Sequence, residues 1–373
     1  KRVLIDKIAI LKGEIEYKDE AAGGEPILLK PVDLVVSSIQ LSDPDQPIRI
    51  LFQTVFQKIK FGFEAGLWLN LREEKIRLGE GKFFAGSGKL LLETTIEQFM
   101  GKDPRINAKL QAPSFDMRDL LPLIGLPPEV AIKENPQFEL SVQGSTMDPE
   151  VNGRLHVGKI SYNNAYDFTD LDIEFGYKKG EATLKHLTGA LLDGRLLTTG
   201  TVGLGKTMPY MVSVDLANLD INKGTTVASG RGSLKVEANG EGLDQPSIEK
   251  NLKAKGLLTL ADGKIHSLNL VRSVFSQQIT GTIQTALGGR SDIVELPGQK
   301  EEGTAYKTIT IPFTIENGKL LIEEMTLDHS GYRGTMSGSI GLDMMANLTG
   351  RFFLPPGTTD QLIPNSKVRE YIA

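Results

Sequence analysis

The sequence predicts a mainly β fold: an antiparallel β-sheet built from repeated hairpin units with a few short capping helices. Three observations carry this prediction, namely an internal repeat, apolar residues that alternate with polar ones, and turn dipeptides between the alternating runs. Glycine is abundant, at 40 of 373 residues, whereas aromatic residues make up only 6%. Such a composition favours many turns and few helices.

The internal repeat is the strongest of the three observations. Residues 171–204 are repeated without a gap at 309–342, an offset of 138 positions. A second unit, 153–160, reappears at 256–265 with two extra residues, and a weaker copy lies around 75–93. Similarity at a fixed period is typical of architectures in which no single unit can bury its own apolar face. The function is therefore expected on a surface.

Apolar residues recur at every second position, which is the spacing of a half-buried strand. In 210–216, for example, Tyr210, Val212 and Val214 share one face while Met211 and Ser213 share the other. Turn dipeptides that tolerate positive φ are expected to join such strands as hairpins. They are Lys179-Gly180, Asp193-Gly194, Asp262-Gly263 and Asn317-Gly318.

Helical patterns are short. The segment Phe115–Ile124 follows a possible Ser114 cap and ends before Pro127-Pro128, and Ile48–Lys60 follows a proline-rich turn. The other expected helices are Ser247–Lys253, Leu268–Gln277 and Thr282–Leu287. Each is expected to plug an end or an edge of the sheet, with association with a membrane or a partner as the alternative.

Three regions are expected along the chain: a β-rich part with short helices over 1–150, a first repeat over 151–225, and a C-terminal region over 226–373. The sequence begins without methionine inside an alternating strand and ends in what resembles the start of a helix. We therefore expect both ends to be cut, and any signal or membrane anchor to lie outside this sequence.

Composition excludes several classes of function. The formal charge of −5 comes from acidic and basic residues mixed along the whole length, with no basic block for a nucleic acid. The absence of cysteine excludes disulfides, cysteine-based zinc sites and thiol nucleophiles. The four histidines stand at unrelated spacings and are expected at the surface or at a sheet edge. We expect no metal, no cofactor and no nucleic-acid partner.

One motif match is misleading. Residues 200–207 satisfy the phosphate-loop pattern G-x-x-x-x-G-K-[ST], which requires a following helix to hold the phosphates. Pro209 follows at once, and the next residues alternate as a strand. The second copy, from Gly338, keeps the strand glycines but lacks the lysine and threonine. The segment therefore predicts a strand, a tight turn and a strand, with no nucleotide.

The apolar faces of the repeated strands remain as the candidate site. A repetitive sheet with few helices must either close on itself or expose an apolar surface to another molecule. Acyl chains suit such a surface, because burying each methylene contributes about 0.8 kcal/mol without a directional partner. The expected lipid-facing residues are Tyr210, Val212, Val214, Leu216, Leu234, Val236, Ile311, Phe313, Ile315, Ile340, Leu342, Leu348, Phe352 and Leu354.

The glycine and aliphatic patterns resemble the AsmA-like family, bacterial envelope proteins related to TamB and to the bridge-like lipid-transfer proteins. The resemblance covers mainly residues 153–355, and the first 150 residues match only in style. The residues that carry it are Gly230–Ala238, Gly242, Ser247–Lys253, Gly256–Leu270, Phe313–Leu327 and Gly338–Leu342.

The resemblance implies a periplasmic protein anchored to the inner membrane of a Gram-negative bacterium. It implies an elongated, curled antiparallel β-sheet, groove-like or taco-like, whose hydrophobic groove holds or moves phospholipid acyl chains between the inner and outer membranes. It also implies no catalytic residues and possible envelope protein partners. The alternative is a structural scaffold that assists outer-membrane protein assembly through exposed strand edges. A glycan-active enzyme is a third possibility, and it would require convergent carboxylates in a polar cleft.

Overall fold

The computed structural model describes residues 5–17, 27–40, 43–270, 272, 301–341 and 345–353, and these residues are mainly β. Twenty strands within these ranges belong to one antiparallel sheet, which confirms the predicted fold class. The curl and the groove stay a prediction. The chain forms two compact units, Lys1–Gly189 and Ala190–Ala373, and each is described by itself.

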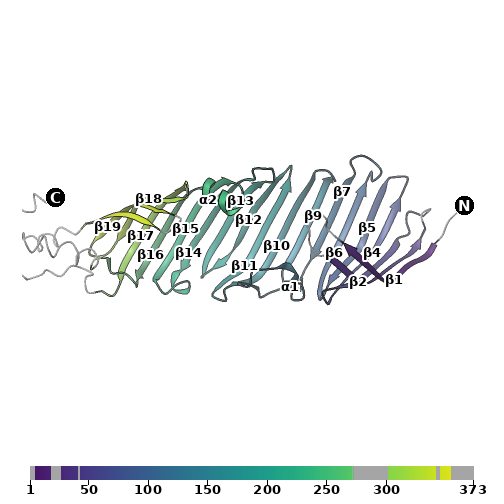
Figure 1. Ribbon diagram of the computed structural model, residues 1–373, viewed down its shortest axis with the longest axis horizontal. Helices are drawn as coiled ribbons and strands as arrows, with labels where there is room; N and C mark the ends of the chain where they lie inside the picture. Colours follow the sequence, from purple (N-terminus) through teal and green to yellow (C-terminus); the bar gives the residue numbers. More distant parts are fainter. Residues whose placement is uncertain are drawn as a thin grey trace, which may run out of the picture. The chain divides into compact units, whose positions relative to one another are not determined.

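The described strands of unit 1 form a meander in which neighbours in sequence are mostly neighbours in the sheet (Figure 1). They are β1 (Ile5–Tyr17), β2 (Ile27–Ile39), β3 (Ile48–Phe56), β4 (Ile59–Asn70), β5 (Lys75–Ala85), β6 (Gly88–Glu97), β7 (Arg105–Ala112), β8 (Val130–Ile132), β9 (Gln137–Ser145), β10 (Pro149–Tyr162) and β11 (Tyr166–Lys178). Strand β12 (Glu181–Leu191) spans the boundary between the units.

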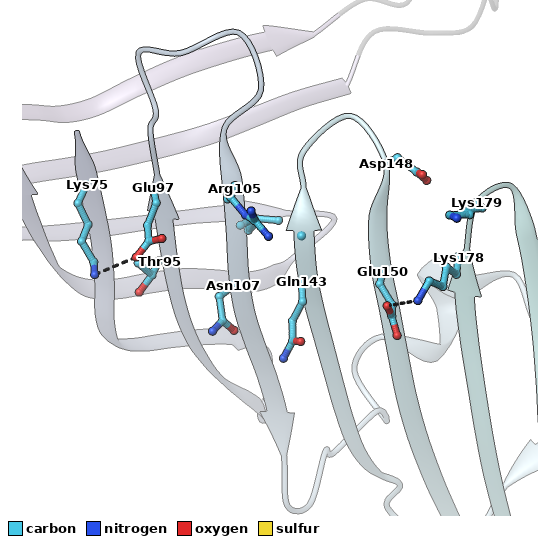
Figure 2. A pocket seen from close by; sticks show the side chains of 12 residues that line it. Lys75, Thr95, Glu97, Arg105, Asn107, Gln143, Asp148, Glu150, Lys178 and Lys179 are labelled. Carbon is cyan, nitrogen blue, oxygen red and sulfur yellow. Dashed lines mark hydrogen bonds and ion pairs between the residues drawn. The ribbon is translucent and has the colours of Figure 1, made fainter. Parts of the chain in front are cut away.

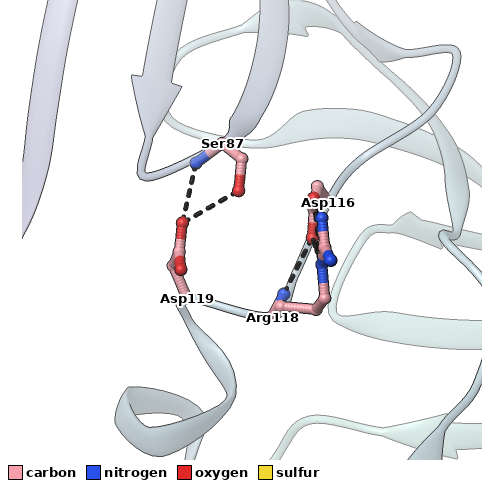
Figure 3. Close-up of polar contacts among 4 residues, drawn as sticks. All are labelled: Ser87, Asp116, Arg118 and Asp119. Atoms are coloured by element: carbon pink, nitrogen blue, oxygen red, sulfur yellow. Dashed lines mark hydrogen bonds and ion pairs between the residues drawn. The ribbon is translucent and has the colours of Figure 1, made fainter.

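The segment between β7 and β9 is an insertion in this meander, because β9 pairs directly with β7. The insertion contains α1 (Leu121–Ile124) and β8, which pairs with the end of β10. Figure 3 shows how it is held at the turn between β5 and β6. The backbone N–H and the hydroxyl of Ser87 both donate to Asp119 Oδ2, at 3.0 and 2.8 Å. The adjacent Arg118 donates to Asp116 and lowers the pKa of that carboxyl.

The described strands of unit 2 continue the antiparallel pattern, each paired with the next. They are β13 (Gly194–Gly203), β14 (Pro209–Asp220), β15 (Ala228–Glu241), β16 (Lys253–Ile265), β17 (Thr304–Glu316), β18 (Lys319–Asp328), β19 (Arg333–Gly341) and β20 (Ala346–Phe353). A 3₁₀ helix, η1 (Ile221–Lys223), and the helix α2 (Gln245–Asn251) follow β14 and β15.

Two of the predicted hairpin turns are confirmed. Lys179 and Gly180 have φ of 50° and 76°, and Asn317 and Gly318 have φ of 52° and 67°, as a type I′ turn requires. The other two predictions need correction. The turn before β13 is centred one residue earlier than expected, with positive φ at Leu192 and Asp193.

The dipeptide Asp262-Gly263 is not a hairpin turn, and that prediction was wrong. Both residues lie inside β16, where Asp262 has a φ of 49° and the register with β15 shifts by one residue, so that Asp262 and Gly263 lie opposite the single residue Gly230. The same tolerance of positive φ that suits Asp-Gly to a turn also suits it to a β-bulge. The local dipeptide does not distinguish the two structures.

The helix predictions are mixed. The helix expected at Ser247–Lys253 is confirmed as α2, capped by Asp244, whose side chain accepts a hydrogen bond from the Ser247 N–H. The expected helix Phe115–Ile124 is reduced to the single turn α1. Two further predicted helices fall largely outside the described residues. Of Leu268–Gln277 only residues 268–270 and 272 are described, and none of Thr282–Leu287 is.

The helix expected at Ile48–Lys60 was wrong, because the segment contains β3, a turn and the start of β4. Its apolar residues also fit period two, and the β-branched and aromatic side chains favour a strand. Gln57 and Lys58 have φ of 48° and 70°, which makes them the centre of a hairpin turn. The helical spacing was a coincidence of a run with many apolar residues.

The buried core of unit 2 is a small cluster at one end of the strands. Tyr306, Ile309, Leu327 and Tyr332 are each at most 5% exposed and pack together. The Tyr306 hydroxyl donates to the backbone carbonyl of Ser229 at 2.6 Å, which gives this buried polar atom a partner. Burial raises the pKa of Tyr306, and it raises the pKa of Tyr332 to about 12 together with the nearby negative charge of Glu301.

Candidate functional site

The lipid-facing residues expected on β14 and β15 lie on one face. Residues that pair directly across antiparallel strands point to the same side of a sheet. Val212 pairs with Ala238, Val214 with Val236 and Leu216 with Leu234. Tyr210 pairs with Gly240, and a Cβ built on that glycine would lie 2.4 Å from the tyrosine hydroxyl oxygen, so the tyrosine side chain covers the glycine.

The same face continues across the remaining strands of unit 2. One row of directly paired residues runs from β13 to β20: Thr198, Val214, Val236, Gly256, Phe313, Ile322, Gly338 and Leu348. The next row is Gly200, Val212, Ala238, Ala254, Ile315, Leu320, Ile340 and Ala346. We call the side chains of these two rows, with Tyr210, Leu216, Leu234, Leu258, Ile311 and Phe352, the apolar face of unit 2.

The apolar face is only partly covered. Most of its side chains are half-buried, and Leu348 is 40% exposed. Phe352 is also half-buried and packs against the core cluster. Of the expected lipid-facing residues, Leu342 and Leu354 lie outside the described residues. The other twelve all belong to this face.

The opposite side of the same strands is mostly polar. Thr199, Ser213, Glu237, Lys255 and Thr314 form one directly paired row there. In the adjacent row, Lys235 lies 3.6 Å from Asp215. Water can solvate these side chains, so covering them would contribute little free energy. Covering the apolar face removes apolar surface from water, which is favourable.

Unit 1 has a corresponding apolar face that the sequence reasoning did not assign. Ile10, Leu34, Phe52, Phe63, Phe83 and Leu90 form a directly paired row across β1 to β6. A second row across β5 to β11 contains Gly81, Leu92, Leu110, Leu140, Gly153 and Phe175. The signal that could have found them is the same alternation, for instance at Phe61 and Phe63, which was hidden by the helical reading of the preceding segment.

The two repeated pairs of strands, β10–β11 in unit 1 and β16–β17 in unit 2, have the same register. Leu155 pairs with Ile173 as Leu258 pairs with Ile311. Gly153 likewise pairs with Phe175 as Gly256 pairs with Phe313. In both copies a Cβ built on the glycine would lie 2.2 Å from the phenylalanine Cζ. The aromatic ring therefore lies flat over the glycine, an arrangement that stabilises glycine within strands.

The phosphate-loop pattern has the predicted strand, turn and strand. Gly200 and Gly203 belong to β13, a turn follows, and β14 begins at Pro209. No helix N-terminus is present at this position to hold phosphates. The prediction of a structural role for these glycines is confirmed.

The histidines form no metal centre within the described ranges, where no group of three potential ligands converges. His186 lies 3.9 Å from Glu174 on a half-exposed surface. The expectation of a surface position was wrong for His329, whose side chain is 6% exposed. Its ring stacks on Tyr332 at 4.3 Å between centroids, and its Nδ1 accepts from the Gly331 N–H at 3.0 Å.

Concave surface in unit 1 occurs on the polar side of the strands. One concavity of about 620 Å³ lies over β5 to β11 and includes Arg105, Asn107 and Gln143 (Figure 2). A second, of about 340 Å³, lies over β2 to β5 near the ion pair of Arg49 and Glu80. Neither matches the expected acyl-chain groove, because charged side chains line both, although Val35, Ile50 and Leu51 also line the second.

Comparisons with known proteins assign no family. No protein-family model matches the chain, no curated protein matches it, and no solved structure matches it. In the part of the chain that the structure describes, no helix combines the length and apolarity needed to cross a membrane. The described residues form a long antiparallel β-sheet of twenty strands.

Proposed function

We propose that this protein binds the acyl chains of phospholipids on the apolar faces of its strands, as a non-enzymatic lipid-binding or lipid-transfer protein. The observation that carries the proposal is the shared register of β10–β11 and β16–β17, which keeps aliphatic and aromatic residues at matching positions of one face. A repeated apolar face that is only half-buried is suited to a ligand that is itself long, apolar and repetitive.

The energy available is large enough for such binding. Each methylene removed from water contributes about 0.8 kcal/mol, so a sixteen-carbon chain would gain on the order of 10 kcal/mol if it were fully covered. Part of this gain offsets the entropy lost when the flexible chain is ordered. No directional partner is needed, which fits rows composed, apart from Thr198, of Val, Ile, Leu, Phe, Ala and Gly.

The setting we propose is the periplasm, where the protein would hold or move phospholipid between the inner and outer membranes. The resemblance of residues 153–355 to AsmA-like envelope proteins supports this setting. An anchor in the inner membrane would lie outside this sequence.

The test uses a photoreactive amino acid at neighbouring positions of β15. When p-benzoylphenylalanine replaces Val236 it projects from the apolar face, and when it replaces Lys235 it projects from the polar side. After incubation with phospholipid vesicles and irradiation, we expect a lipid adduct by mass spectrometry from position 236 and little from 235. Equal labelling at both positions, together with native mass spectra free of phospholipid, would contradict the proposal.

The scaffold alternative has one observation in its favour. Strand β20 pairs with β19 among the described strands, and nearly all of its side chains are exposed. An exposed strand of this kind can accept a further strand from a partner protein. Photoreactive residues placed on β20 would then yield protein adducts instead of lipid adducts when irradiated in an envelope extract.

A further inference from the structure

The larger concavity of unit 1 is separate from the apolar rows of that unit and contains side chains with unused hydrogen-bonding capacity. It has a volume of about 620 Å³ and lies on the polar side of β5 to β11 (Figure 2). Its lining residues are Lys75, Thr95, Glu97, Arg105, Ile106, Asn107, Gln143, Gly144, Asp148, Glu150, Lys178 and Lys179. The volume falls within the range of small-molecule sites, although the lining is far more polar than usual.

Two ion pairs flank this concavity, and the two opposite charges of each pair cancel. Lys75 lies 3.1 Å from Glu97, and Lys178 lies 2.8 Å from Glu150. The hydrogen bond and charge of Lys178 lower the pKa of Glu150, and those of Glu150 raise the pKa of Lys178. Both Lys178 and Glu150 are therefore charged at neutral pH.

The remaining charged groups leave an excess of positive charge. The lining has four cationic and three carboxylate side chains. Within the described part of the chain, neither Arg105 nor Lys179 has an ion-pair partner, although Glu97, which is paired with Lys75, lies directly across from Arg105. The whole protein carries a formal charge of −5, so this local excess does not follow from the composition. A guanidinium presents several N–H donors in a fixed plane that matches phosphate and carboxylate oxygens.

Three neutral polar side chains form a paired row next to Arg105. Thr95 pairs with Asn107, and Asn107 pairs with Gln143, so all three point to the same side of β6, β7 and β9. Arg105 lies two residues before Asn107 on the same side of β7. In Figure 2 the two amide side chains lie next to each other below Arg105. Amides and hydroxyls can both donate to and accept from sugar or glycerol hydroxyls.

We propose that this concavity binds a phosphate ester that also carries hydroxyl groups, with Arg105 on the phosphate and Asn107 and Gln143 on the hydroxyls. The site does not depend on the proposed lipid function, since it lies on the opposite side of the strands from the apolar rows of unit 1. The phosphate ester has two sources, a free molecule such as glycerol phosphate or the head group of a lipid such as phosphatidylglycerol.

Isothermal titration of the full chain with glycerol 3-phosphate tests the proposal. Saturable binding is expected, and Arg105→Gln should weaken it about tenfold or more, because a hydrogen bond to a charged group is lost. The matched control is Lys109→Gln, on the same side of the same strand but paired with Glu139 at 2.9 Å. This control should change the dissociation constant less than about twofold, because the paired lysine lies outside the concavity.

A second variant and a second ligand sharpen the assignment. Asn107→Ala should weaken the binding of glycerol 3-phosphate but leave that of inorganic phosphate unchanged, because only the ester carries alcohol hydroxyls. Circular dichroism of each variant checks that the strands are retained. No saturable binding of glycerol 3-phosphate, or equal weakening by Arg105→Gln and Lys109→Gln, would overturn the proposal.

Vesicles distinguish the two sources. Sedimentation with phosphatidylglycerol vesicles that is reduced by Arg105→Gln identifies a lipid head group. Binding of the soluble ester without any Arg105-dependent sedimentation identifies a free phosphate ester. Either result supports the site, and both leave the acyl-chain proposal to its own crosslinking test.

Discussion

The strand pairs β10–β11 and β16–β17 have one face in common and differ on the other. On the apolar side, Val151, Gly153, Leu155 and Val157 of β10 have Ala254, Gly256, Leu258 and Leu260 as their counterparts in β16. On the other side the charged side chains of the first copy are replaced by apolar ones in the second. Arg154 and Glu174 pair directly in the first copy, whereas Leu257 and Pro312 pair in the second.

This difference indicates that the residue types are restricted on the apolar side and free to vary on the polar side. A sheet needs one buried or covered face to be stable, and it tolerates many polar residues on a solvated face. Stability alone would explain why the apolar residues stay apolar. It does not explain why the face stays half-open, with a phenylalanine ring laid over a glycine at the same place in both copies. The matching shape agrees with the proposal that both copies bind an apolar ligand.

The largest expected effect comes from the matching residues Leu171 and Ile309, which are 6% and 1% exposed. Ile309→Ala should lower the free energy of unfolding by about 3–4 kcal/mol, since it removes buried methyl groups and leaves a cavity beside Leu327. Leu171→Ala should cost less, about 2–3 kcal/mol. Hydrogen exchange of the amides in each unit measures the two effects separately.

The control for this prediction is Thr310→Ala, next to Ile309 on the polar side. It should change the free energy of unfolding by no more than about 0.5 kcal/mol. A larger loss from Thr310→Ala than from Ile309→Ala would show that the assignment of the two faces is wrong.

The next effect concerns the glycines beneath the aromatic rings. Gly153→Val and Gly256→Val should each cost about 1–3 kcal/mol, because the new side chain meets the ring of Phe175 or Phe313. Truncating the ring in the same molecule, as Gly256→Val with Phe313→Ala, should remove part of the clash. A double-mutant cycle in each copy measures this coupling. Additive costs would mean that the ring and the glycine do not interact.

A pH effect should distinguish the second copy from the first. Tyr332 lies in the core cluster of unit 2, and the position 138 residues earlier is Gly194. The folded pKa of Tyr332, about 12, is above the unfolded value of about 10. Its contribution to stability is therefore complete below about pH 10 and is lost as the pH rises toward 12.

Base titration followed by hydrogen exchange or near-ultraviolet circular dichroism checks this expectation. Tyr332→Phe should remove that part of the alkaline destabilisation of unit 2, because phenylalanine does not ionise. An unchanged alkaline transition in this variant would assign the loss to other groups, such as Tyr306.

The smallest expected effect is on the polar side of the first copy. Arg154 donates to Asp172, and this hydrogen bond lowers the pKa of the carboxyl. The contribution is present above the unfolded pKa of about 4 and is lost as the pH falls through the lower folded value. Asp172→Asn should cost less than about 1 kcal/mol, since the pair lies at the surface. Thermal melts at low and high salt measure it, and a cost that does not fall with salt would contradict an ion-pair origin.

Much of the fold could be predicted because period two and the turn residues are local signals. The strand at 210–216, the turns at Lys179-Gly180 and Asn317-Gly318, and the strand reading of the phosphate-loop pattern all follow from a few adjacent residues. The bulge at Asp262 could not be predicted, because the same dipeptide fits a turn and only the pairing with β15 decides between them.

The site could be predicted only in part for a related reason. Alternation identifies which residues share a face within a strand, as at Tyr210, Val212 and Val214. It does not give the partner strand, so the row that joins Phe313 to Gly256 becomes visible only with the register. The polar concavity around Arg105 brings together residues 75 to 179, and no local pattern marks such an assembly.

The insertion between β7 and β9 has a consequence for how such chains acquire new parts. Because β7 and β9 pair as an ordinary hairpin would, the intervening residues can be lengthened or shortened without changing the order of the strands. The hydrogen bonds from Ser87 to Asp119 then attach the added segment to a turn two strands away. An evolving meander can gain accessory segments at its turns while its rows of paired side chains remain intact.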